Sequence, residues 1–94
     1  MATYTLPDGV VCYRTLGPWT ESEIPVGLLK QHQLKAGSWG KLSVLSGSIE
    51  FCWDDVISAE PNRLPKGQRL IIPPTIMHHL QITGQVVLDL HFYK

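Results

Sequence analysis

Four histidines are the side chains of this 94-residue chain best suited to metal or proton chemistry: His32, His78, His79 and His91. Neighbouring residues of a strand point to opposite faces, so His78 and His79 cannot both enter one interior site. We expect His78 to point inward and His79 outward. A site made of histidines alone then has three ligands at most, His32, His78 and His91. Three protein ligands beside one open position are typical of a catalytic metal centre.

The ligand chemistry of such a site suits a divalent metal, and zinc, iron and nickel fit about equally well. Glu50 or Asp89 could add a carboxylate if its strand presents that side chain inward. Two alternatives stay open from the residues alone. The imidazoles could hydrogen-bond a small anionic ligand, or each could be a hydrogen-bonded, half-buried side chain that binds nothing.

Other catalytic arrangements are not indicated by the sequence. The chain contains no GxSxG elbow, HExxH helix, GxGxxG loop or Walker loop. The adjacent carboxylates Asp54 and Asp55 are most simply interpreted as a solvated turn. Cys12 and Cys52 form no CxxC motif, and we expect two small buried hydrophobic side chains. Large aromatic residues stabilise small cores. We therefore expect the three tryptophans, Trp19, Trp39 and Trp53, to be core residues.

Many short apolar runs separated by glycine and proline predict an all-β fold, a sandwich or a barrel. We expect one hairpin of strands 42–45 and 48–53 around Ser46-Gly47, and a second of strands 79–82 and 85–93 around Thr83-Gly84. The remaining predicted elements are strands at 10–13, 26–34, 56–59 and 68–72, one helical turn at 20–23 and an exposed loop at 60–66.

The segment 67–79 positions the predicted site. Pro73-Pro74 must end the strand at 68–72, because proline lacks the ladder N–H, and His78 then opens the next strand. The last strand has one apolar face for the core. Its other face carries Asp89 and His91 and is either a solvated surface or the wall of a polar cavity.

Composition predicts a single globular domain over residues 1–94, with 1–9 as a loose N-terminal segment. Eight basic residues balance eight acidic ones, so a nucleic-acid partner is not indicated. No apolar run approaches the ~18 residues that span a bilayer. The first residues carry neither a basic nor an apolar signal region, so we expect a cytoplasmic protein.

Two stretches resemble the cupin motifs. Gly67, Pro73 and His78 are similar to the second motif, with Thr75 in place of its usual glycine and Ile82 where asparagine is frequent. Residues 44–51 resemble the end of the first motif, whose usual His-x-His and Glu ligands are replaced by residues 35–40.

The chain more closely resembles the TehB/YeaR-like cupin family, over residues 10–94. The residues that carry this resemblance are 11–14, Pro18-Trp19-Thr20, His32, 37–47, Pro73-Pro74 and His78. The resemblance implies a single cupin-like jelly-roll β-barrel, a homodimer, and His32 and His78 as the expected histidines. In the longer members, catalysis belongs to a following S-adenosylmethionine-dependent methyltransferase domain, so we expect no methyl transfer by residues 1–94 alone.

The leading interpretation is a small cupin-like binding domain linked to tellurite or related stress, with a pocket near His32 and His78 for a metal or small anionic ligand. One alternative is a small metal-dependent oxygenase or isomerase that uses the same histidines. Another is a dimerising interaction module without a functional pocket. An unpaired sheet edge invites association, which also favours a homodimer.

Overall fold

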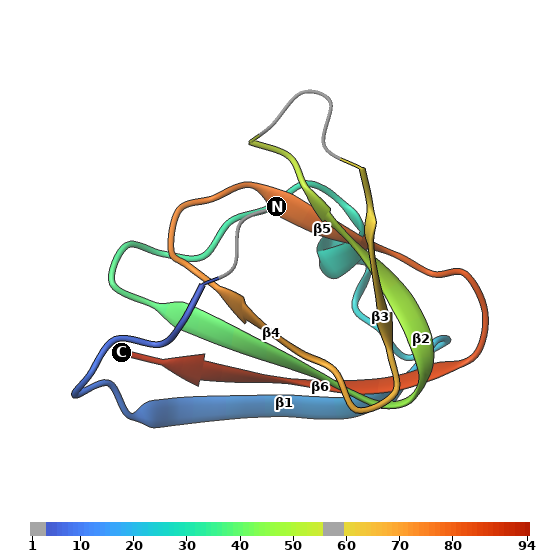
Figure 1. Ribbon diagram of the computed structural model, residues 1–94, viewed down its shortest axis with the longest axis horizontal. Helices are drawn as coiled ribbons and strands as arrows, with labels where there is room; N and C mark the ends of the chain where they lie inside the picture. The colour runs from blue at the N-terminus through green and yellow to red at the C-terminus, as the bar shows by residue number, and fades with distance from the viewer. Residues whose placement is uncertain (1–3, 56–59) are drawn as a thin grey trace.

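The strands of this molecule form an antiparallel sheet that folds over on one long strand (Figure 1). The computed structural model describes residues 4–55 and 60–94. Its elements are β1 (Cys12–Thr20), the 3-10 helix η1 (Val26–Leu29), β2 (Trp39–Trp53), β3 (Asn62–Pro65), β4 (Arg69–Ile72), β5 (His78–Gln81) and β6 (Val86–Tyr93). The all-β class is confirmed. The radius of gyration of 12.5 Å is that of one compact domain.

The long strand β2 belongs to both halves of the sheet. Its N-terminal part pairs with β6 and β4, and β1 continues this first half beyond β6. Its C-terminal part pairs with β3 and β5 in the second half. Figure 1 shows β2 leaving the level of β1 and β6, bending, and running back up beside β3 and β5.

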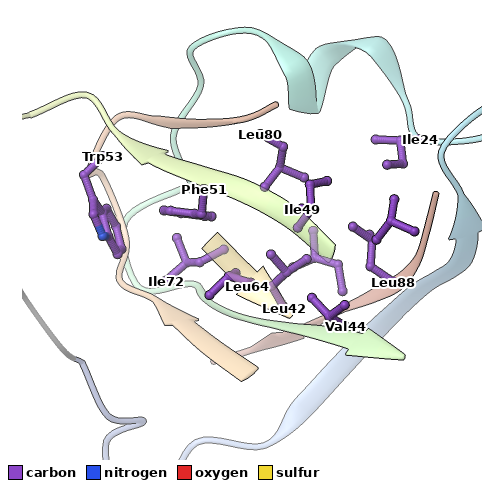
Figure 2. Close-up of a cluster of buried hydrophobic side chains, with 12 residues drawn as sticks. Ile24, Leu42, Val44, Ile49, Phe51, Trp53, Leu64, Ile72, Leu80 and Leu88 are labelled. Carbon is purple, nitrogen blue, oxygen red and sulfur yellow. The ribbon is translucent and has the colours of Figure 1, made fainter. Parts of the chain in front are cut away.

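A β-bulge in β2 lets side chains from both halves of this strand point into the same core. Between Val44 and Ser46, two residues of β2 oppose one of β6, and Gly47 follows with a φ of 70°. One extra residue reverses the alternation of side chains along a strand. Leu42 and Val44 before the bulge, and Phe51 after it, therefore all point into the same core (Figure 2).

Both predicted hairpins are wrong. Ser46-Gly47 lies inside β2, where the glycine serves the bulge rather than a two-residue turn. Thr83-Gly84 joins β5 to β6, but these two strands pair with different halves of β2 and not with each other. A glycine pair between apolar runs fits a bulge or a crossover as well as a hairpin, and the long-range pairing to β2 decides between them.

Two shorter predictions also fail. The strand expected at 26–34 begins instead with η1, because Leu28 N–H donates to the Pro25 carbonyl and closes a 3-10 turn. The loop expected at 60–66 contains β3, where Asn62 and Leu64 are buried against the interior. The strand expected at 56–59 lies outside the described residues. The prediction at 68–72 is confirmed by β4.

The closed jelly-roll barrel is not shown. The pairing path runs β1-β6-β2-β3, and within residues 4–55 and 60–94 no pairing joins β1 to β3. The sheet closes over its core by the bend of β2 instead. Trp53 lies in that core, Trp19 packs against it, and Trp39 is half-buried outside it. In the described part of the chain, no helix has the length and hydropathy needed to cross a membrane.

Candidate metal site at a histidine pair

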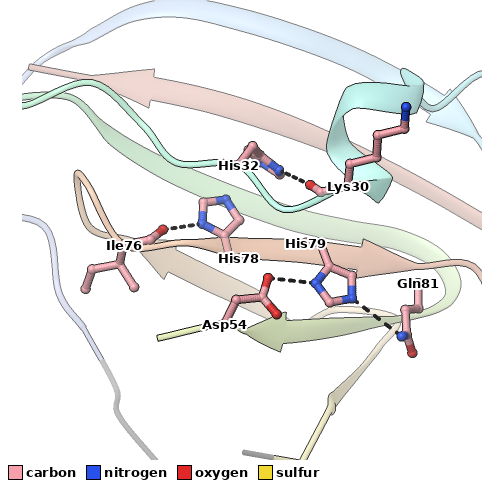
Figure 3. A network of polar contacts seen from close by, with 7 residues as sticks. All are labelled: Lys30, His32, Asp54, Ile76, His78, His79 and Gln81. Atoms are coloured by element: carbon pink, nitrogen blue, oxygen red, sulfur yellow. Dashed lines mark hydrogen bonds and ion pairs between the residues drawn. The ribbon is translucent and has the colours of Figure 1, made fainter. Parts of the chain in front are cut away.

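His32 and His78 come from distant parts of the chain, and their rings meet edge to face. His78 begins β5 beside Trp53 at the end of β2, whereas His32 follows η1. The two residues form an isolated antiparallel bridge, in which each backbone N–H donates to the other carbonyl at 3.0 and 2.9 Å. Their ring centres are 4.2 Å apart with the planes at 66°. Figure 3 shows the two rings beside each other. The backbone bridge therefore fixes how the imidazoles meet.

In each ring, a hydrogen bond to the backbone carbonyl two residues earlier in the chain sets the tautomer. Nδ1 of His32 lies 2.8 Å from the Lys30 carbonyl oxygen, and Nδ1 of His78 lies 2.8 Å from the Ile76 carbonyl oxygen. A carbonyl oxygen only accepts, so each Nδ1 carries the proton and donates it. The lone pair of each neutral ring is then on Nε2. Among the described residues, neither of these Nε2 atoms has a hydrogen-bond partner.

Burial keeps His78 neutral. Its ring stacks on Phe51 with centres 5.2 Å apart and planes at 16°, and the residue is 2% exposed. Desolvation lowers the pKa of His78 to about 4, and the charge of His32 adds to this effect, although the hydrogen bond to Ile76 opposes it. At neutral pH His78 is therefore an acceptor at Nε2 and not a cation. His32 is half-buried at the outer side of the pair.

The pair borders a small apolar cavity of about 40 Å³. Apart from the two imidazoles its wall consists of Leu28, Leu34, Leu42, Phe51, Ile72, Leu80, Leu90 and Phe92. This volume has room for about one or two waters or a single ion, but not for an organic substrate. The two imidazoles are the residues of this wall whose side chains contain polar atoms, and the surface exposed to the cavity is apolar.

The structure does not bring His91 to this pair. β6 buries Val86, Leu88 and Leu90, so His91 and Asp89 project from the opposite face. Nε2 of His91 is there 3.7 Å from an Asp89 carboxylate oxygen. The expected set of His32, His78 and His91 therefore does not form one ligand group, because strand alternation places its third member on the outer surface. The polar face of the last strand lies away from the core, where Asp89 and His91 line a separate pocket of about 290 Å³ together with Lys41, Ser43 and Arg69.

Carboxylates are also missing from the pair. Glu50 alternates with the fully buried Ile49 and Phe51, which turns it away from the core. Asp89 lies on the outer face of β6. Across residues 4–55 and 60–94, no group of three histidine, cysteine, aspartate or glutamate side chains is arranged to hold a metal. The histidine pair thus offers two protein ligands.

His79 points outward, as expected, but it is not free. Its Nδ1 donates to a carboxylate oxygen of Asp54 at 2.7 Å (Figure 3). The sequence interpretation of Asp54 as part of a solvated turn missed this contact, because residues 25 positions apart meet only through the pairing of β2 with β5. No local sequence signal indicates it.

The two cysteines differ in environment. Cys52 is buried opposite His79, and burial raises the pKa of its thiol, with the charges of Asp54 and Glu50 adding to the rise. Cys12 is exposed at the start of β1, where a buried side chain was expected. The prediction of a buried cysteine is confirmed for Cys52 and wrong for Cys12.

A family model described as the TehB-like domain matches residues 14–90. Two curated relatives from Haemophilus influenzae strains are named "Probable S-adenosyl-L-methionine-dependent methyltransferase TehB". Each is 30% identical to this chain over 93 residues, which is 94% of this chain and 32% of the relative. The chain thus spans about a third of the length of the curated relatives it matches.

Solved structures share the fold. A crystal structure of a protein from Escherichia coli K12 has a TM-score of 0.84 at 19% identity, over 98% of this chain and 97% of that one. The crystal structure of TehB from H. influenzae has a TM-score of 0.80 at 24% identity, over 92% of this chain and 32% of that one. KdgF from Halomonas sp. reaches 0.54 at 20% identity, over 68% and 55%. Because the family model covers most of the sequence, this chain belongs to the TehB-like domain family.

Proposed function

We propose that this chain is a small cytoplasmic, cupin-like binding domain whose His32–His78 pair holds one divalent metal ion. The observation that carries the proposal is the shared tautomer: both Nδ1 atoms donate to backbone carbonyls, which leaves both Nε2 lone pairs unpartnered. Metal-binding histidines use this arrangement, since a carbonyl on one ring nitrogen orients the other toward the ion. Zinc, iron and nickel suit imidazole ligands. Water would complete the coordination.

An anionic ligand fits this pair less well. To donate a hydrogen bond to an anion from Nε2, the ring would need a second proton on that nitrogen. The depressed pKa of His78 opposes this protonation at neutral pH. The surrounding wall is made of hydrocarbon and aromatic side chains and supplies no other donor. A cation is therefore the better partner for Nε2 lone pairs that no hydrogen bond occupies.

The proposed domain binds rather than catalyses. A metal held by two histidines would supply Lewis acidity, but neither Glu50 nor Asp89 lies inward to act as a base beside it. The relatives named as methyltransferases extend well beyond the part that this chain matches. We place methyl transfer outside residues 1–94, and we assign the domain an accessory role in tellurite resistance or related stress.

Calorimetric titration with Zn²⁺ and Ni²⁺ tests the metal site on protein purified without an affinity tag and treated with a chelator. We expect one ion per chain. His32→Ala and His78→Gln should each weaken binding at least about tenfold, since each removes one of two protein ligands. His91→Ala is the matched control and should bind like the parent, because His91 lies on the outer face of β6.

Circular dichroism of each variant establishes that it is folded before titration. Substoichiometric metal that is unchanged in His32→Ala would contradict the site. Equal weakening in His91→Ala and His32→Ala would also contradict it, because adventitious binding to surface histidines gives that result.

A further inference from the structure

A wide cleft of about 640 Å³ lies on the molecule where three chain segments meet. Tyr13 and Arg14 of β1 form one wall, and Phe92 and Lys94 at the end of β6 form the floor. The loop at 33–38, between η1 and β2, forms the other wall. Figure 1 shows the start of β1, the end of β6 and this loop on the same side of the molecule. The volume lies within the ~300–1,000 Å³ of small-molecule sites.

The charged side chains of this cleft all have one sign. Arg14, Lys35 and Lys94 line it, whereas none of its lining residues is acidic. The whole chain carries equal numbers of acidic and basic residues, so this asymmetry is local. In the part of the chain that the structure describes, both recorded ion pairs involve histidines, and none of these three basic side chains takes part in one. A cleft lined by one sign of charge concentrates ligands of the other sign.

Polar and aromatic groups in the same cleft are held in place. The Tyr13 hydroxyl and Ser38 Oγ are 2.6 Å apart, and Ser38 is buried. The Lys94 ammonium lies 4.5 Å from the centre of the Tyr13 ring, whose own neighbour is Phe92 at 6.3 Å. The backbone of Lys94 pairs with that of Val11 in both directions. The cleft therefore combines fixed hydroxyls, cations and an aromatic wall.

We propose that this basic cleft binds a small molecule that carries a phosphate or carboxylate group beside a planar or apolar part. The anionic group would accept hydrogen bonds from Arg14 and Lys35, which are stronger when donor and acceptor are charged. The planar part would contact Tyr13 and Phe92. This site is separate from the histidine cavity, and only Leu34 and Phe92 line both. It does not require a bound metal.

The experiment is an NMR titration of metal-free protein with adenosine 5′-monophosphate, adenosine and inorganic phosphate, at low salt. We expect adenosine 5′-monophosphate to shift backbone amides of the cleft, with a dissociation constant at least about tenfold below that of adenosine, because adenosine lacks the anionic group. Inorganic phosphate should shift fewer of the same amides. The affinity should fall as salt is added, since ionic screening weakens exposed charge pairs.

Two double variants with equal loss of charge identify the site. Arg14→Gln with Lys35→Gln should weaken binding about tenfold or more, and both side chains are exposed, so the fold should persist. Lys66→Gln with Arg69→Gln removes the same charge from exposed positions outside the cleft and should change little. Zn²⁺ affinity should be the same in both double variants, which separates this test from that of the histidine pair.

Equal weakening in the two double variants would overturn the proposal, because net charge would then explain the binding. Shifts centred on His32 and His78 would overturn it too, since the anion would belong to the histidine pair. The same holds if none of the three probes binds at about 10 mM, where even a weak site with a millimolar dissociation constant is mostly occupied.

Discussion

At the scale of single residues, burial decides what the histidine pair can do. His78 is enclosed between Phe51, Trp53 and His32, and only its Nε2 is left without a partner. At Nε2 this neutral imidazole accepts but does not donate, while its Nδ1 donates to the Ile76 carbonyl. The same burial links the protonation of His78 to the stability of the fold.

The pH dependence of stability follows from the pKa of His78. That pKa is about 4 in the folded chain and near 6.5 in the unfolded chain. Between these values the unfolded state binds more protons, so the free energy of unfolding falls as the pH drops from about 6.5 toward 4. The contribution is complete above the unfolded pKa, and about 2–3 kcal/mol of it is lost between about pH 7 and pH 4.5.

Urea unfolding of metal-free protein at these two pH values measures the effect. In His78→Gln the loss of stability on acidification should be smaller by this amount, because the titrating ring is gone. His91→Gln is the control and should keep the dependence of the parent. An identical loss in the parent and in His78→Gln would show that His78 titrates normally in the folded state.

Thr75, a residue with a side chain, adopts a left-handed backbone conformation that favours glycine. The resemblance to the cupin motif aligns Thr75 with a usual glycine, and Thr75 adopts a φ of 66°. The left-handed conformation costs a residue with a Cβ roughly 1–2 kcal/mol. The hydrogen bond from Thr75 N–H to the Leu34 carbonyl, at 3.0 Å, holds the loop in place despite this cost. The position of His78 three residues later therefore depends on the backbone conformation and not on glycine itself.

At the scale of elements, β2 determines the architecture through Gly47. A side chain at this position would overlap the backbone of Gln85 and lie 2.9 Å from Val86 Cα, and the positive φ adds further strain. Only glycine lets β2 and β6 approach closely enough to pass the bulge. The bend between the two halves of the sheet starts there.

Gly47→Ala should lower the free energy of unfolding by about 3 kcal/mol or more, because steric overlap and backbone strain act together. Chemical denaturation monitored by tryptophan fluorescence measures the change. Gly84→Ala is the matched control, since a Cβ at Gly84 meets no atom within 4 Å, and its stability should change little. Equal stability of Gly47→Ala and the parent would rule out the tight crossing of β2 and β6.

The local sequence pattern predicted where the strands lie better than it predicted which strands pair with each other. The β class, the strand before Pro73-Pro74 and the inward and outward faces of His78 and His79 all depend on neighbours in sequence, and they are confirmed. The role of Ser46-Gly47 depends on what lies across the sheet, where Gln85 meets Gly47. Nothing within a few residues distinguishes this bulge from a turn.

The residues of the candidate sites likewise fall into those that the sequence indicated and those that only the folded structure brings together. The resemblance to a family indicated His32 and His78, and the structure places their rings together. His91 was grouped with them only because of its residue type, and strand alternation separates it. The basic cleft was not predicted, because Arg14, Lys35 and Lys94 meet only after β1, β6 and the loop before β2 have assembled. Isolated basic residues carry no such signal in a chain of zero net charge.

At the scale of the whole molecule, the homodimer stays a prediction, and β1 is the element that favours it. β1 pairs only with β6 among the described strands and lies at an edge of the sheet. Val11, directly before it, is 66% exposed. An unpaired strand edge beside exposed apolar side chains favours association with a second copy.

Light scattering of Val11→Lys tests this edge. We expect the parent to have the mass of a dimer and Val11→Lys to shift toward the monomer, because the substitution places a charge at the contact. Val26→Lys is the matched control: Val26 is 67% exposed on η1, away from β1, and its variant should stay dimeric. A monomeric parent, or a dimer that both variants leave intact, would exclude this edge as the interface.

Because both halves of the sheet share β2, its pairing also determines how the molecule unfolds. β3, β4, β5 and β6 all pair with β2, and among the described strands β1 alone lacks this pairing and pairs with β6 instead. Detachment of β2 would leave each half without the strand that holds it, so neither half can persist as a partly folded remnant. Unfolding should therefore be all-or-none. The histidine pair, attached to one end of β2, and the basic cleft, next to the other, would be lost in the same event.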